Sequence, residues 1–173
     1  MKTRTFSVGL FGFFVLLSCL REPPKLPEET QEGLGTFGCL INGELVLRDR
    51  DRLVWTGKGG YMRSGVIGKQ DTLGRFVLVA RTEFGHIFHF FISHPQIGQN
   101  VIDSVFFWHE NGNHMYIARS VPYIYFTRFD HVASGTFEFD AERYNRHTHE
   151  RIPGKKIEVR RGRFDTWLQR TSQ

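Results

Sequence analysis

The 173-residue sequence has only two cysteines, Cys19 and Cys39, and no apolar run long enough to span a membrane as a helix. Its longest uncharged apolar run, Phe6 to Leu17, has twelve residues, whereas a membrane-spanning helix needs roughly 20. Gly-x-Ser-x-Gly and Ser-x-x-Lys motifs are absent, and Gly57-Lys58-Gly59-Gly60 lacks the spacing of a phosphate-binding loop. These absences argue against a membrane-spanning helix and against the common nucleophilic hydrolases.

The first nineteen residues have the layout of an export signal. Lys2 and Arg4 precede the apolar run, which is typical of a secretory signal peptide. The run ends in Leu16-Leu17-Ser18-Cys19, which resembles the lipobox of bacterial lipoproteins. The resemblance implies cleavage before Cys19, a diacylglyceryl group on its sulfur and an acylated amine with palmitate among the chains. The alternatives are an ordinary signal peptide with a chance cysteine, or an uncleaved anchor.

Lipidation of Cys19 would fix both the location of the protein and the state of its second cysteine. Two or three acyl chains hold a protein on a membrane almost irreversibly. Cys39 then has no disulfide partner, so we interpret it as a small buried apolar residue.

The mature chain has the size of one domain. Removing residues 1–18 leaves 173 − 18 = 155 residues and, with Lys2 and Arg4 gone, lowers the net charge from +5 to +3. We expect a signal peptide at 1–18, a lipidated cysteine and a flexible tether rich in proline and glutamate at 19–35, and a single domain at 36–173. An exported protein with this small charge is not expected to bind nucleic acid.

The apolar pattern of the domain has a period of two, which is typical of β-strands. Asn42-Gly43 lies between two apolar runs and predicts a hairpin turn. In the run from Gly135 to Tyr144 we expect Phe137, Phe139 and Ala141 to point into the core. The pattern predicts an all-β fold, an antiparallel sandwich or barrel-like sheet of about eight to ten strands. Helix should be short if present, with Pro95 to Val101 as its place.

Two stretches resemble a family of uncharacterised envelope lipoproteins from Bacteroidota-type bacteria. The opening contains Thr36-Phe37-Gly38-Cys39-Leu40-Ile41-Asn42-Gly43-Glu44, and the closing stretch runs from Gly135 to Asp165. Where the family often has Trp and Pro after Asn-Gly-Glu, this chain has Leu45-Val46-Leu47. The resemblance implies an envelope location and a β-rich fold. It implies no catalytic residue, because the family carries no established activity.

Histidines and carboxylates are the residues to consider for a metal or acid/base site. His86 and His89 should fall on opposite faces of a strand, and His147 and His149 lie in a polar loop. His109, Glu110 and His114 flank a tight turn and have the side chains that zinc prefers, so they are the metal-site candidates. We interpret the turn as a surface loop in the first instance, and expect no catalytic residue and no cofactor.

Aromatic side chains are the candidates for a sugar-stacking surface. The six candidates are Trp55, Trp108, Trp167, Tyr116, Tyr123 and Tyr125. We expect at most two of them on the surface and the others in the core. The basic residues between 141 and 173 are interpreted as the solvated face of an outer strand.

Together these features predict a lipid-anchored, non-catalytic interaction or assembly module of the cell envelope. The alternative is a glycan- or lipid-binding lipoprotein, with a metal-dependent hydrolase third. Leu20 stands where an aspartate would resemble an inner-membrane retention signal, which favours the outer membrane. The acidic cluster of surface-exported lipoproteins is lacking after Cys19, which favours the periplasmic leaflet. The expected partners are the membrane, through Cys19, and an envelope protein or glycan.

Overall fold

A computed structural model describes residues 25–48, 54–55, 61–62, 65–109, 115–145, 147–148 and 150–170. At 54–55, 61–62 and 109 only the backbone is described. Within these ranges the chain forms strands, turns and no helix. The strands are β1 (Leu34–Ile41), β2 (Glu44–Leu47), β3 (Val54–Trp55), β4 (Tyr61–Met62), β5 (Val66–Gln70), β6 (Phe76–Arg81), β7 (His86–Ile92), β8 (Gly98–Val101), β9 (Ser104–His109), β10 (Met115–Ala118), β11 (Tyr123–Phe129), β12 (Val132–Asn145) and β13 (Glu150–Arg170).

Eleven of these strands form one sheet, and β3 and β4 form a separate pair. The order of the large sheet is β2-β1-β13-β5-β6-β7-β9-β10-β12-β11-β8, with a further pairing between β13 and β12. That pairing closes a circuit, so the all-β, barrel-like prediction is confirmed, with more strands than the eight to ten expected. The position proposed for a short helix is wrong, because residues 98–101 form β8.

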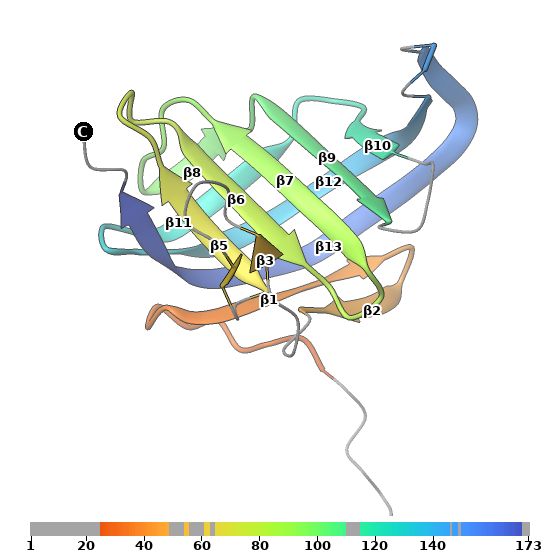
Figure 1. Ribbon diagram of the computed structural model, residues 1–173. Helices are drawn as coiled ribbons and strands as arrows, with labels where there is room; N and C mark the ends of the chain where they lie inside the picture. The colour runs from red at the N-terminus through yellow and green to blue at the C-terminus, as the bar shows by residue number, and fades with distance from the viewer. Residues whose placement is uncertain are drawn as a thin grey trace, which may run out of the picture.

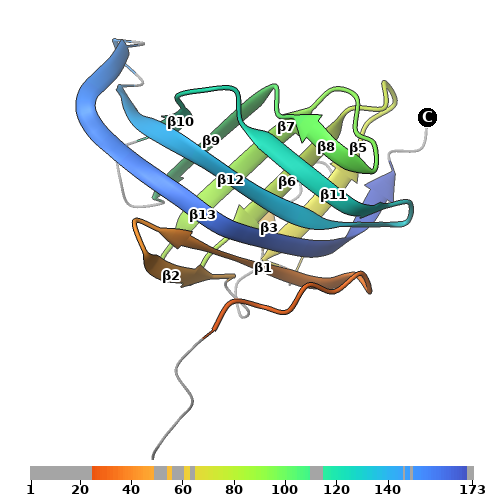
Figure 2. The same ribbon diagram turned by 180° about the vertical axis from the view of Figure 1, so that it is seen from behind.

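Two long strands close the circuit by changing partners along their length. One edge of β13 pairs with β1 and then, in parallel, with β5 through residues 168–170. One edge of β12 pairs with β11 and then with β10, while its other edge follows β13 throughout. The strands β5, β6, β7 and β9 therefore form one layer, and β8, β11, β12 and β13 lie behind it (Figures 1 and 2).

Alternating side chains from both layers fill the space between them. Seven phenylalanines of the described chain are fully buried: Phe37, Phe76, Phe88, Phe90, Phe107, Phe126 and Phe137. Their rings pack at centroid distances such as 4.8 Å for Phe88 with Phe107 and 4.8 Å for Phe90 with Phe137. Each buried ring contributes on the order of 2–3 kcal/mol through burial of apolar surface, so this cluster is a large part of the hydrophobic core.

The sequence pattern explains which residues face inward. Phe137, Phe139 and Ala141 are buried, as predicted, and Glu138 and Asp140 between them are exposed. Asn42 and Gly43 have φ values of 51° and 85°, which is the left-handed pair that a two-residue hairpin turn requires, so the β1–β2 hairpin is confirmed.

Gly135 of β12 and Gly162 of β13 lie where a side chain would have no room. A Cβ on Gly135 would lie 2.1 Å from the carbonyl oxygen of Tyr125, and a Cβ on Gly162 would lie 2.3 Å from the ring of Phe137. Only glycine allows these contacts. They hold β11, β12 and β13 together beneath the surface described next.

Candidate functional site

Strand registers bring polar and aromatic side chains together on the outer face of the layer that contains β8, β11, β12 and β13. Tyr125 lies opposite Gln99 of β8 and Thr136 of β12, and Thr136 lies opposite Arg163 of β13. With strands about 4.8 Å apart, this row spans about 14 Å. A second row places Tyr123 between Val101 and Glu138.

The two tyrosines point outward because β11 alternates regularly. Ile124 and Phe126 are 1% and 0% exposed and belong to the core, whereas Tyr123 and Tyr125 are 46% and 52% exposed. Together with Trp167, which is 57% exposed, they make three exposed aromatics among the five candidates whose side chains are described, so the expectation of at most two is wrong.

These rows form an open groove of about 610 Å³. It is lined by Glu29, Gln99, Tyr123, Ile124, Tyr125, Thr136, Phe137, Glu138, Arg161, Gly162 and Arg163. The floor is the sheet itself, and Glu29 belongs to the segment that runs along the sheet before β1 (Figure 2). A groove with aromatic rings, amide, hydroxyl and charged groups is suited to a flat polar ligand.

Arg163 is fixed at one end of the groove. Its Nη1 donates to the carbonyl oxygen of Pro27 at 2.9 Å, and its Nε lies 3.4 Å from Oε1 of Glu29. The charge of this arginine is therefore matched within the protein.

Arg161 is held differently, at a β-bulge. Phe137 pairs with Gly162 and Phe139 with Val159, so Arg160 and Arg161 together face Glu138. Arg161 has a φ of 53°, a left-handed conformation that costs a residue with a side chain about 1–2 kcal/mol. Its backbone N–H donates to Oε1 of Glu138 at 3.0 Å, which helps to hold this conformation.

β8 is the last strand of the sheet beside the groove, and no other strand of the described ranges pairs with its outer edge. Ile102 N–H donates to Pro122 C=O at 2.9 Å, and hydrogen-bonded pairs alternate along an antiparallel ladder, so the backbone groups of Gln99 and Val101 point away from β11. Five exposed apolar side chains lie on or beside this edge: Ile97, Val101, Val121, Tyr123 and Tyr125.

The segment before β1 is attached to the back layer through Asp165. This carboxylate is 1% exposed and accepts hydrogen bonds from the hydroxyls of Thr30 and Ser134, both at 2.6 Å. It also accepts from three backbone N–H groups, those of Glu32, Gly33 and Leu34, at 3.0–3.2 Å. Burial raises the pKa of Asp165, but these hydrogen bonds outweigh it and the net pKa is lowered.

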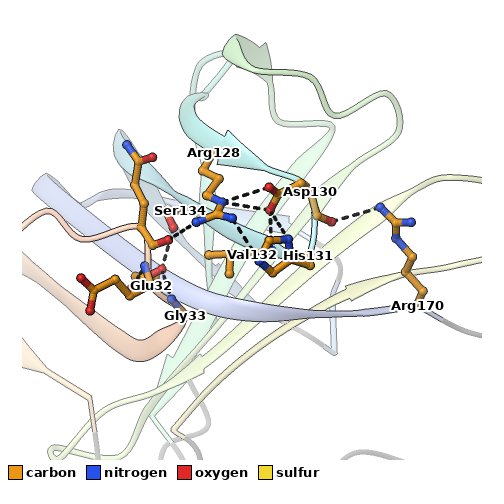
Figure 3. Close-up of polar contacts among 10 residues, drawn as sticks. Glu32, Gly33, Arg128, Asp130, His131, Val132, Ser134 and Arg170 are labelled. Carbon is orange, nitrogen blue, oxygen red and sulfur yellow. Dashed lines mark hydrogen bonds and ion pairs between the residues drawn. The ribbon is translucent and has the colours of Figure 1, made fainter.

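Arg128, near the end of β11, strengthens the same attachment. Its Nη1 donates to the carbonyl oxygen of Gln31 at 2.6 Å. Its Nε donates to Oδ1 of Asp130 at 3.0 Å, a contact that Figure 3 shows. The hydrogen bond from Arg128, followed by that from the Val132 N–H, lowers the pKa of Asp130. Residues 27–34 therefore already make contacts with the fold, although the expected domain begins at residue 36.

The opposite layer carries a second aromatic cluster on its outer face. His89 stacks against Phe106 and Trp108 at centroid distances of 5.2 and 4.9 Å, and burial lowers its pKa to about 4. His86 instead lies 6.2 Å from the core ring of Phe107, so the two histidines face opposite sides of the strand as predicted. His89 is neutral at pH 7 and contributes apolar packing here.

The structure leaves most of the candidate metal ligands untested. Glu110, His114 and His149 lie outside the described residues, as does the lipidation candidate Cys19, and only the backbone of His109 is described, opposite His86. His147 is exposed in the β12–β13 turn. No group of three or more histidine, cysteine or carboxylate side chains that could hold a metal occurs among the described residues. The described ranges also contain no helix with the length and apolarity to cross a bilayer.

Sequence reasoning identified Tyr123 and Tyr125 but missed Arg161 and Asp165. The tyrosines were visible as aromatic residues, whereas the role of Arg161 depends on a bulge that no residue type signals. Asp165 was visible only as the end of the closing stretch of the family resemblance. Comparison of the chain with protein-family models, with curated proteins and with solved structures gives no match.

Proposed function

We propose that the protein is a lipid-anchored cell-envelope protein that binds a glycan in the groove. The observation that carries this proposal is the pair of exposed tyrosines, Tyr123 and Tyr125, beside the polar groups of Gln99, Thr136 and Glu138. A sugar ring has apolar C–H faces that pack on aromatic rings and hydroxyls that need hydrogen-bonding partners at its edge. The row of about 14 Å has room for two to three sugar units.

The anchor would keep the groove close to the membrane. If Cys19 carries the lipid, seven residues, or eight Cα–Cα steps, separate it from Pro27, whose carbonyl oxygen accepts a hydrogen bond from Arg163 in the groove. A chain of eight such steps reaches at most about 28 Å. The ligand is therefore expected at the membrane surface, and we propose the periplasmic leaflet of the outer membrane as its place.

The glycan proposal is tested by measuring binding of the full-length protein, in mild detergent, to a panel of oligosaccharides. We expect the Tyr123→Ala/Tyr125→Ala double variant to lose at least tenfold in affinity, because stacking on exposed rings is lost. Phe84→Ala is the matched control, since Phe84 is 55% exposed in the β6–β7 turn of the other layer. Equal loss in both variants, or no loss in the double variant, would contradict the proposal.

The lipid anchor is tested by mass spectrometry of the protein extracted from its own membrane. The expected mass starts at Cys19 and includes acyl chains. A mass that retains residues 1–18, or that lacks lipid, would refute the anchor and the location that depends on it.

A second candidate function is binding of an envelope protein by strand addition at β8. It is favoured by the free backbone groups of Gln99 and Val101 and by exposed Ile97, which is 69% exposed. A partner bound in this way should no longer be cross-linked to a Val101→Lys variant in membranes. It should still be cross-linked to the control variant Leu73→Lys, because Leu73 is an exposed turn residue in the other layer. Retention in both variants would argue against β8 as the interface.

A further inference from the structure

Among the described residues, Arg161 differs from its neighbouring arginines on β13 because no carboxylate pairs with its guanidinium. Arg160 contacts Asp140 at 2.5 Å, and Arg163 is paired with Glu29. Arg161 is exposed, and within the part of the chain that the structure describes its guanidinium makes no ion pair or hydrogen bond. The groove therefore presents the exposed guanidinium of Arg161 to a ligand, with the Glu138 carboxylate beside the Arg161 backbone.

The bulge explains why this guanidinium lies in the groove. In a regular strand, successive side chains would alternate between the two faces, but the extra residue opposite Glu138 redirects the chain between Val159 and Gly162. Arg161 adopts a left-handed backbone conformation there, which is unfavourable for a residue with a side chain. Backbone strain of this kind is concentrated at ligand sites.

We propose that the groove selects saccharides that carry a carboxylate, that is, uronic-acid units; this rests on the glycan-binding function proposed above. The sugar ring packs on Tyr123 or Tyr125, and its carboxylate receives two parallel hydrogen bonds from the Arg161 guanidinium. A planar guanidinium matches a planar carboxylate in this way. Glu138 uses Oε1 for the Arg161 backbone, which leaves Oε2 to accept from a sugar hydroxyl.

The test compares acidic polysaccharides with their own methyl esters, which keep the backbone and remove the charge. Polygalacturonate, alginate and hyaluronate are titrated into the full-length protein in acid and esterified form. We expect at least one of them to bind ten to a hundredfold more tightly as the acid, which is the range for charge-assisted hydrogen bonds.

Variants of Arg161 assign this preference to one residue. Arg161→Asn removes the charge while tolerating the left-handed backbone, so it should bind acid and ester equally and unfold at the same temperature or higher. Arg161→Lys keeps the charge without the planar fork and should give an intermediate preference. Lys156→Gln is the matched control, because it removes an exposed charge from the same strand outside the groove.

Each other outcome overturns the proposal. If Arg161→Asn weakens acid and ester equally, the residue has only a structural role. If Lys156→Gln reduces acid binding as much as Arg161→Asn, the preference reflects net charge. If neutral glycans bind in a tyrosine-dependent manner and the acids bind no better than their esters, the groove binds glycans but does not select carboxylates. If none of the three polysaccharides binds in either form, the inference fails.

Discussion

Replacing Asp165 with asparagine should detach the segment before β1 from the sheet. In the native protein, Oδ2 accepts from Thr30, Glu32 and Leu34, and Oδ1 accepts from Gly33 and Ser134. An amide can place its oxygen at only one of these two positions. Its NH₂ group would then lie against other hydrogen-bond donors. A hydroxyl can rotate to accept from the NH₂ group instead, but a backbone N–H cannot.

The magnitude follows from the donors that lose their acceptor. With the amide oxygen at the Oδ2 position, the buried Gly33 N–H is left without a partner, which costs about 1–3 kcal/mol. The other hydrogen bonds weaken because they are no longer made to a charged group, so the total loss should be about 3 kcal/mol. For a domain of this size, that corresponds to a decrease in Tm of about 6–12 °C.

The assay is thermal and urea unfolding of Asp165→Asn beside Asp103→Asn, an exposed aspartate that should change stability by less than about 0.5 kcal/mol. The pH dependence gives a second test. Because the pKa of Asp165 is lowered in the folded state, its stabilising contribution is present above the ordinary carboxyl value of 3.8 and is lost as the pH falls below it. The variant should lack this part of the acid-induced loss. An unfolding free energy within about 0.5 kcal/mol of wild type would refute the reasoning.

Three other residues give direct tests of the packing. Gly135→Ala should destabilise the protein by at least about 3 kcal/mol in urea unfolding, because its Cβ would meet the Tyr125 carbonyl. The control Gly74→Ala has open space around the new Cβ but a φ of 79°, so it should cost about 1 kcal/mol. Similar losses in the two variants would contradict the close approach at Gly135. The pKa of His89 is lowered to about 4 by burial, so the unfolded state takes up the proton first and stability should fall between pH 6.5 and 4. His89→Phe should flatten this part of the profile, and an unchanged profile would show that His89 is not its source. Burial raises the pKa of Cys39 to about 12, so peptide mass spectrometry should find Cys39 unmodified by iodoacetamide at pH 8 until the protein unfolds; rapid native modification would contradict its burial.

The strand pattern was predictable where a strand has one face in the core, as β6 and most of β12 do. Phe137, Phe139 and Ala141 alternate with polar residues in the sequence and point inward in the structure. The Asn42-Gly43 hairpin was predictable because both residues accept a positive φ. Local chemistry therefore determined the fold class and several of its elements.

The closure of the sheet was not predictable from the same pattern. It depends on β12 and β13 changing partners along their length and on close contacts at Gly135 and Gly162, which involve residues distant in sequence. The short β8 was mistaken for a possible helix because Gly98 to Val101 shows no alternation of apolar residues. Its pairing with β11 is a tertiary interaction that overrides weak local preference.

The candidate site also combines residues that the sequence could identify with residues that only the tertiary structure identifies. Tyr123 and Tyr125 could be proposed for sugar stacking from their residue type alone, but their exposure depends on β11 having its outer face uncovered. Arg161 could not be identified, because it was one of many basic residues in an apparently ordinary outer strand. Its distinction comes from the bulge opposite Glu138, which requires the register of two strands.

The central claim, that a glycan binds in the groove, is tested most directly by mapping chemical-shift changes in the full-length protein in detergent micelles. Amide and aromatic signals are recorded while the tightest-binding oligosaccharide of the panel is titrated. The account predicts shifts concentrated at Gln99, Tyr123, Tyr125 and Thr136, with the signals of His89 and Trp108 on the opposite layer unchanged. Shifts centred on His89 and Trp108, with the tyrosine rings unaffected, would contradict it.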